Sequence, residues 1–260
     1  MSLRHTSVLI DAALQAAGFA ATFSTAPDAT EARNLHEMQR GRIHLSLLPT
    51  SPSRLELLRR GKLRMVPIPL ERGLLGWRAC FVLRKQADLL AGVRTLQDLR
   101  HFTIGQGGGW LDVQMYRSAG LTTREVPDWR DGHFCRQMES GLIDLFPMGL
   151  DEAQHYFLAH FQKRYPQLVL DRHLLLHYPW YRVIWVSPHP QADALYEALN
   201  TGFDRIVHER TFLDLWTRLR PPPAPDAWRQ RTVLSLKTPW FGADLIPPKY
   251  QHLLLRPRWS

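Results

Sequence analysis

Cysteine is scarce in this sequence: Cys80 and Cys135 are the only two in 260 residues. They lie in separate segments, and neither has a His or Cys neighbour at the spacing of a zinc site. The twelve histidines are scattered rather than grouped. We therefore expect no disulfide framework, no metal and no cofactor. A single disulfide between the two cysteines is an alternative that the sequence leaves open.

Long apolar runs are also missing. No stretch reaches the roughly eighteen uninterrupted apolar residues of a membrane helix. The apolar segment Val8–Ala17 is broken by Asp11 and Gln15 and offers no signal-peptidase site. We expect no membrane insertion. As written, the sequence predicts a cytoplasmic protein, whereas a signal peptide encoded upstream would make it periplasmic.

The motifs that activate a nucleophile do not occur. There is no Gly-x-Ser-x-Gly elbow, and the glycines of 105–109 are not followed by the Lys-Ser/Thr of a phosphate loop. Asp112, Glu139 and Glu152 are available carboxylates, but no pattern in the sequence pairs them. We predict that the chain is not an enzyme.

Acidic residues are outnumbered, which leaves a formal net charge of +9. Such a charge attracts anions over long range. However, the Lys and Arg residues are spread along the chain, and no basic run is interleaved with aromatics. The pattern favours a solvated basic surface and no nucleic-acid partner.

What the sequence does contain is an alternation of strand and helix patterns. A helix is predicted over 9–17, a short strand over 20–23, a helix over about 30–40 and a buried strand over 43–48, and similar units recur between 95 and 170. Repeated strand-helix units of this length imply a mainly parallel sheet flanked by helices. The predicted class is α/β.

Two apolar runs, Ala79–Leu83 and Val183–Val186, interrupt this alternation. If each passes from one sheet to another, residues 84–182 form a second lobe inserted into a first lobe made of 1–83 and 183–260. A proline-rich stretch opens a C-terminal tail of the first lobe at about residue 220. This two-lobed organisation predicts a hinge and a cleft.

Five segments carry a resemblance to a known family. They are Thr95–Arg100, Thr103–Gly107, Gly141–Phe146, Thr201–Phe203 and Thr211–Leu215. In this order they resemble the family 3 bacterial extracellular solute-binding proteins, the type II periplasmic-binding fold of ABC-transporter receptors. The similarity extends from about Leu9 to Trp216. Family members begin with an export signal and a first strand, whereas this chain opens almost directly in the first helix.

The resemblance implies non-catalytic binding of a small polar or anionic solute in the cleft, by a monomer that serves a transporter permease or a sensor. Two alternatives remain open. One is a cytoplasmic or degenerate ligand-binding module. The other is an enzyme on the same fold, because the family resembles cyclohexadienyl dehydratases.

On the first lobe, the resemblance points to Thr50, Ser51 and Arg54. The Ser51–Arg54 spacing matches a family pattern in which Arg binds a ligand carboxylate, a task that suits the paired donors of a guanidinium. The alternative is a Ser that caps a helix and an Arg that is solvated.

On the second lobe, Gly107 and Gly108 join a strand to a helix, so free backbone N–H groups would face a ligand and Trp110 could stack on it. The alternative is a plain glycine turn. Trp77 and Arg78 precede the crossover and are further candidates, although a Trp there could equally belong to the core.

One departure from the family concerns the ligand class. Amino-acid-binding members place an Asp five residues after the position of Asp144, and here that residue is Gly149. The anchor for an α-ammonium group is missing unless Asp151 or Glu152 replaces it. We therefore include Glu152 among the candidates and do not predict amino acids as the ligand.

Overall fold

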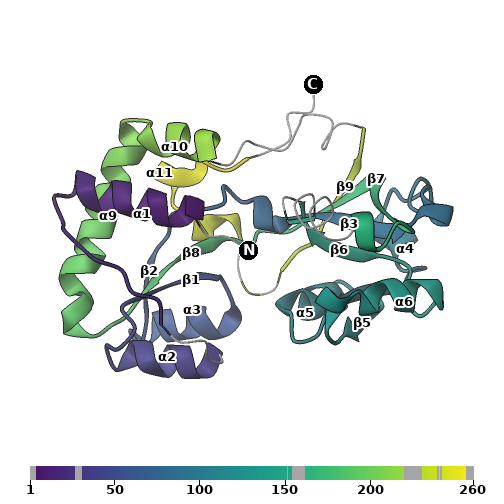
Figure 1. Ribbon diagram of the computed structural model, residues 1–260, viewed down its shortest axis with the longest axis horizontal. Helices are drawn as coiled ribbons and strands as arrows, with labels where there is room; N and C mark the ends of the chain where they lie inside the picture. Colours follow the sequence, from purple (N-terminus) through teal and green to yellow (C-terminus); the bar gives the residue numbers. More distant parts are fainter. Residues whose placement is uncertain are drawn as a thin grey trace. The chain divides into compact units, whose positions relative to one another are not determined.

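The computed structural model describes residues 4–26, 31–150, 152–153, 162–219, 230–238, 240 and 242–255 (Figure 1). The chain divides into two compact units. Unit 1 comprises Met1–Arg72, Tyr181–Pro222 and Asp244–Leu254, and unit 2 comprises Gly73–Trp180, Pro223–Ala243 and Leu255–Ser260. Among the described residues, no helix is long and apolar enough to cross a membrane.

Unit 1 contains a small sheet and six helices among its described residues. In chain order the elements are α1 (Arg4–Ala16), α2 (Glu31–Gln39), β1 (Leu45–Pro49), α3 (Pro52–Arg59), β2 (Arg64–Val66), β8 (Arg182–Val186), α9 (Asp193–His208), α10 (Thr211–Leu219) and α11 (Pro248–Gln251). The predicted helices over 9–17 and 30–40 and the strand over 43–48 correspond to α1, α2 and β1.

The sheet of unit 1 has the order β1-β8-β2, and both of its pairs are antiparallel. The predicted mainly parallel pairing is therefore wrong for these strands. Because β1 and β2 are both antiparallel to β8, they run in the same direction, and α3 connects them as in a strand-helix-strand unit. β8, which comes more than a hundred residues later in the chain, lies between β1 and β2, so these two strands do not pair directly with each other.

The helices α1 and α9 pack closely against each other. Leu9 and Ala13 of α1 and Phe203 of α9 are fully buried. Gly202 faces the α1 backbone, since a β-carbon built on it would lie 1.9 Å from the carbonyl oxygen of Ala13. This glycine allows the two helices to approach without a side chain between them.

We expect Gly202→Ala to destabilise the protein by about 1 to 3 kcal/mol, because α1 must shift to make room. In an unconstrained helix the same change would stabilise by up to about 1 kcal/mol. Urea unfolding measures the difference. Thr201→Ala, at the exposed neighbouring position, is the control and should stay within about 0.5 kcal/mol of wild type. A stabilised Gly202→Ala variant would contradict the close approach of α1 and α9.

The strand predicted over 20–23 does not form. Residues 19–26 carry no regular structure, and Phe23 is 47% exposed. A cavity of about 820 Å³ lies beside this segment and is also lined by Ile43 and by Leu45, the first residue of β1. Among the described strands, β1 pairs with β8 alone, so the segment 20–23 leaves the other edge of β1 unpaired.

Unit 2 contains all the other strands that the structure describes. Its described elements are β3 (Trp77–Leu83), α4 (Leu96–Leu99), β4 (Ile104–Gly107), α5 (Leu111–Ser118), β5 (Thr123–Val126), α6 (His133–Glu139), β6 (Phe146–Gly149), α8 (Gln162–Arg164), β7 (Leu168–His177) and β9 (Thr232–Ser235). Short 3-10 turns lie at Leu74–Gly76, Arg84–Gln86 and Trp129–Asp131. Thr95 and Asp98 form a capping box that begins α4.

The main sheet of unit 2 has the order β6-β3-β7-β9. β3 is antiparallel to both β6 and β7, whereas β9 is parallel to β7. The strands β4 and β5, joined by α5, form the directly parallel pair that the sequence predicts. An isolated parallel bridge between Ile104 and Leu145 adjoins the start of β4.

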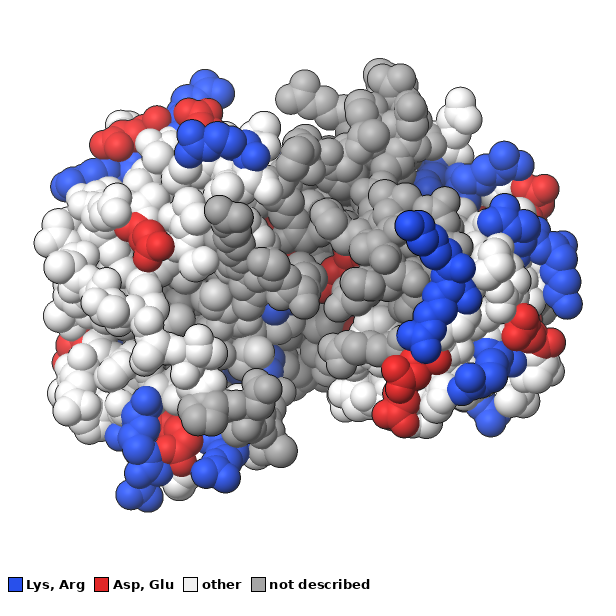
Figure 2. Space-filling view, viewed as in Figure 1, with Lys and Arg blue, Asp and Glu red and all other residues white. Residues whose placement is uncertain are grey.

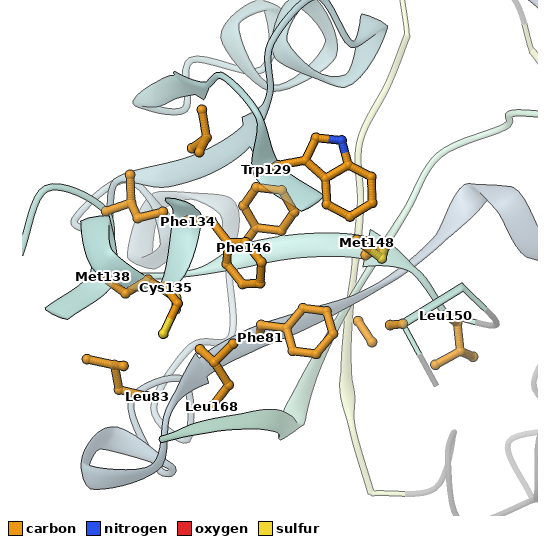
Figure 3. Close-up of a cluster of buried hydrophobic side chains, with 14 of the residues drawn as sticks. Phe81, Leu83, Trp129, Phe134, Cys135, Met138, Phe146, Met148, Leu150 and Leu168 are labelled. Carbon is orange, nitrogen blue, oxygen red and sulfur yellow. The ribbon is translucent and has the colours of Figure 1, made fainter. Parts of the chain in front are cut away.

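The core of unit 2 lies between this sheet and α6 (Figure 3). Phe81 of β3, Phe134 of α6 and Phe146 of β6 are fully buried, and the rings of Phe134 and Phe146 stack with centroids 4.5 Å apart. Met138, Met148 and Leu168 extend the same cluster. Close packing of these rings ties α6 to the sheet.

The boundaries between the units differ from the predicted ones at two places. Unit 2 begins at Gly73 rather than at residue 84, because β3 pairs with β6 and β7 along its length. Part of the predicted first-lobe tail also belongs to unit 2, because β9 pairs with β7. In both cases the sheet hydrogen bonds decide the assignment.

Candidate functional site

In unit 1, the turn from β1 into α3 brings Thr50, Ser51 and Arg54 together. Ser51 is the N-cap of α3, and its Oγ accepts a hydrogen bond from the backbone N–H of Arg54 at 3.3 Å. Pro52 follows at the first helical position, where its fixed φ favours the helix. The backbone N–H of Thr50 donates to the carbonyl of Tyr181 at 2.9 Å, which fixes the turn to the sheet.

The side chain of Arg54 is buried, with 5% of the residue exposed. Its Nη1 donates to the carbonyl oxygen of Pro49 at 2.6 Å. The alternative of a capping Ser with a solvated Arg is thus half right, because Ser51 caps the helix but Arg54 is not in solvent. A buried guanidinium requires polar partners, so this turn is built around a cation.

In unit 2, Arg78 forms a buried ion pair that the sequence did not reveal. Its Nη2 lies 2.7 Å from Oδ1 of Asp112, and the two side chains are 2% and 1% exposed. The Nε of Arg78 donates to the hydroxyl of Tyr178 at 2.6 Å, and that hydroxyl donates in turn to Asp112. Strand β3, helix α5 and the residue after β7 each supply one of the three side chains.

Aromatic rings enclose this triad. The guanidinium carbon of Arg78 lies 4.7 Å from the ring centre of Trp180 and 5.4 Å from that of Tyr178. Burial acts to lower the pKa of Arg78, but the Asp112 carboxylate together with the other acidic groups around it, Tyr178, Tyr116 and Glu152, raises that pKa above its usual value. Burial also raises the pKa of Tyr178 well above its usual value. The triad therefore holds a charged Arg78 beside a neutral Tyr178.

Asp112 lies in the first turn of α5, immediately after the glycines of 107–109. A carboxylate is favoured there by the helix dipole. The first turn of this helix, where the sequence predicts ligand contact, therefore already carries a carboxylate of the chain itself. No pattern in the sequence pairs Asp112 with a partner, because Arg78 is 34 residues away and only the fold brings the two together.

The glycine turn is tied into unit 2. The N–H of Gly108 donates to the carbonyl of Val126 at 3.0 Å, and the N–H of Gly109 donates to Oε2 of Glu125 at 3.2 Å. These two amides are therefore not free, contrary to expectation. Gly107 is needed because a β-carbon on it would lie 2.5 Å from the Trp110 ring. Ligand contact by Gly107 and Gly108 stays a prediction.

Two tryptophans among the candidates contact other aromatic side chains of unit 2. Trp77 is 6% exposed, belongs to the core cluster and lies against His177 with ring centroids 4.1 Å apart. Trp110 is half-buried and meets Trp129 edge to face at 5.0 Å. Trp77 thus follows the core alternative, while Trp110 keeps a partly accessible surface.

Glu152 lies beside Arg78, close to the position where the family places an Asp. A β-carbon built on Gly149 would lie 3.1 Å from Oε2 of Glu152 and 3.3 Å from Nη1 of Arg78. The Glu152 carboxylate also helps to raise the pKa of Arg78. Glu152 therefore supplies a second carboxylate beside Arg78, and its contact with a ligand stays a prediction. The other suggested residue, 151, lies outside the described residues.

Metal and thiol chemistry find little support in the part of the chain that the structure describes. No group of three His, Cys, Asp or Glu residues there could hold a metal ion. Cys80 and Cys135 are free and buried. Burial raises the pKa of Cys135 to about 11, which keeps its thiol protonated at neutral pH.

The basic surface is not uniform. On the face shown in Figure 2, Lys and Arg side chains lie in small groups, several of them beside Asp or Glu. Ion pairs such as Arg42 with Glu37 and Arg172 with Asp88 account for part of this mixing. The absence of a nucleic-acid partner stays a prediction.

Neither the protein-family models nor the curated proteins include a match to this sequence. Solved structures do match. The VFT2 domain of BvgS from Bordetella pertussis superposes with a TM-score of 0.57 at 12% identity, covering 83% of this chain and 84% of that one. The substrate-binding protein AbpA of an amino acid ABC transporter from Streptococcus pneumoniae, bound to L-arginine, has a TM-score of 0.51 at 15% identity and covers 81% of each chain.

A third match is the GluR0 ligand-binding core from Nostoc punctiforme in complex with L-glutamate, with a TM-score of 0.51 at 10% identity, covering 84% of this chain and 91% of that one. The chain has the fold of the type II periplasmic solute-binding proteins. The two-lobed α/β class predicted from the sequence is thereby confirmed. At these identities the likeness shows the fold, and the ligand has to be argued from the residues.

Proposed function

We propose that this chain is a non-catalytic binding protein for a small polar or anionic solute, serving as a transporter substrate-binding or sensory protein. The observation that carries the proposal is the buried Arg54 at the start of α3, held by the capped turn that follows β1. Buried arginines positioned in this way suit the recognition of carboxylate or phosphate groups. The similar structures from S. pneumoniae and N. punctiforme hold L-arginine and L-glutamate, which supports ligand binding on this fold.

The same geometry favours binding over catalysis. A dehydratase-like enzyme needs a carboxylate free to move a proton. Asp112 is instead held by Arg78 and Tyr178 in a dry environment, and Glu152 lies beside the same guanidinium. We therefore assign the Arg78 cluster a structural role in shaping unit 2, and Arg54 the role of contacting the solute.

A transporter permease is the partner that this function implies, with the binding protein acting as a monomer in the periplasm. This partner, the oligomeric state and the location are part of the proposal. A sensory role would replace the permease by a signalling partner without changing the chemistry of Arg54.

A thermal-shift screen tests the proposal. The panel contains amino acids, small mono- and dicarboxylates, polyamines and sugars, each at 1 to 10 mM. A solute that binds only the folded state raises Tm by mass action. At a concentration of 100 times its Kd it increases the free energy of unfolding by about 2.7 kcal/mol. We expect the hits to be solutes that carry a carboxylate or another anionic group. A panel without any hit would favour the degenerate module, and hits confined to polyamines would exclude Arg54 as the anchor.

A further inference from the structure

A second cavity of unit 1 lies away from the α3 turn and carries an unusual concentration of basic side chains. Its volume is about 850 Å³, and it lies where α9 ends, α10 begins and α11 packs beside them (Figure 1). Five of the lining residues are basic, namely Arg205, His208, Arg210, Lys249 and His252, and the one acidic lining residue is Asp204.

Asp204 does not cancel this charge, because it is already engaged. Its carboxylate lies 2.6 Å from Nζ of Lys249 and accepts a hydrogen bond from the hydroxyl of Tyr250 at 2.5 Å. Burial acts to raise the pKa of Asp204, but these two hydrogen bonds outweigh it and lower that pKa. Asp204 and Lys249 therefore form a neutral pair above the buried Tyr250, and the two arginines leave an excess of two positive charges.

Both arginines line the cavity as exposed residues; Arg205 is anchored through its side chain, whereas Arg210 is placed by its backbone. Nη1 of Arg205 donates to the carbonyl oxygen of Ala16 at the end of α1. Arg210 has a left-handed backbone with φ of 65°, which usually favours glycine. Its own carbonyl oxygen accepts the N–H groups of Leu213 and Asp214 at 3.0 and 3.2 Å, which starts α10. A bulky cation thus occupies a position where glycine would cost less.

The dipole of α9 explains only part of this arrangement. Basic residues in the last turn of a helix are common because they compensate its negative end, and this accounts for Arg205 and His208. It does not account for Arg210 beyond the helix, nor for Lys249 and His252 from α11 and the residue after it. Cations from two chain segments, 205–210 and 249–252, converge on one cavity.

We propose that this basic cavity binds a phosphate group. An excess of two positive charges matches a dianion, and guanidinium groups bind phosphate through paired N–H donors. The cavity is larger than one phosphate, so the group can belong to a larger molecule. This site is independent of the solute site at Arg54.

Isothermal titration calorimetry with inorganic pyrophosphate in 50 mM NaCl tests the proposal. We expect saturable 1:1 binding to the wild type that weakens at 300 mM NaCl. The double variant R205Q/R210Q should bind at least about tenfold more weakly. The control R59Q/R60Q removes the same charge from two exposed arginines at the end of α3 and just after it and should stay within about twofold of wild type. Arg54→Ala should also leave pyrophosphate binding unchanged.

A second variant separates binding from folding. Arg210→Gly removes the side chain and relieves the left-handed backbone, so it should raise Tm by about 2 °C while weakening pyrophosphate binding. The matched control is Gln230→Gly, at another residue with positive φ, which should raise Tm without affecting pyrophosphate binding.

Vesicles containing phosphatidic acid distinguish a lipid headgroup from a soluble ligand. No saturable binding to either probe, or equal losses in R205Q/R210Q and R59Q/R60Q, would overturn the proposal.

Discussion

Replacing Arg78 with methionine is expected to lower the free energy of unfolding by about 3 to 5 kcal/mol, because it leaves the carboxylate of Asp112 buried without its cation. Both side chains are almost completely excluded from water. Tyr178 would still donate a hydrogen bond to Asp112, but a neutral hydroxyl cannot replace a guanidinium. Urea unfolding followed by circular dichroism measures the loss.

Two controls make this result specific. The double variant Arg78→Met with Asp112→Leu removes both charges and should be markedly more stable than Arg78→Met alone. Arg172→Met breaks an ion pair with Asp88 whose side chains are 73% and 65% exposed, and it should change stability by less than about 1 kcal/mol. An Arg78→Met variant within about 1 kcal/mol of wild type would show that the buried pair is not formed.

Arg54→Ala is expected to weaken binding of the solute identified by the screen by about 2 to 4 kcal/mol, or about 30- to 1,000-fold in Kd. The reason is that an anionic group would lose its buried, charged hydrogen-bond donor. Isothermal titration calorimetry gives both Kd values. Arg59→Ala, an exposed arginine on the same helix, is the control and should leave Kd within about twofold. An unchanged Kd for Arg54→Ala would remove this residue from the site.

The order of the elements could be predicted from the sequence because local patterns carry it. Apolar residues at helical spacing, as at Leu9 and Ala13, mark helices whose buried face is decided locally. The pair Thr95 and Asp98 predicts the start of a helix, because the two side chains can cap the first backbone N–H groups. Pairing partners are a different matter. β8 lies between β1 and β2 although more than a hundred residues separate it from them, and no local pattern contains that information.

The candidate site divides in the same way. Ser51 and Arg54 are three residues apart, so a capped turn that carries an arginine could be predicted from the sequence. Arg78 was a candidate only because it precedes the crossover, and its partners Asp112 and Tyr178 come from distant segments. Trp77 was a candidate for the same reason as Arg78, but it belongs to the core of unit 2. Burial and charge pairing are properties of the assembled unit, and they decide which candidates are structural.

Ligand-observed NMR on the intact protein tests the central claim most directly, because one sample reports both binding and turnover. Saturation transfer from protein to solute should appear for at least one anionic member of the panel, and the spectrum of that solute should stay unchanged over a day. Conversion of the solute into a new compound would contradict a non-catalytic binding protein, and saturation transfer to no member of the panel would contradict solute binding itself.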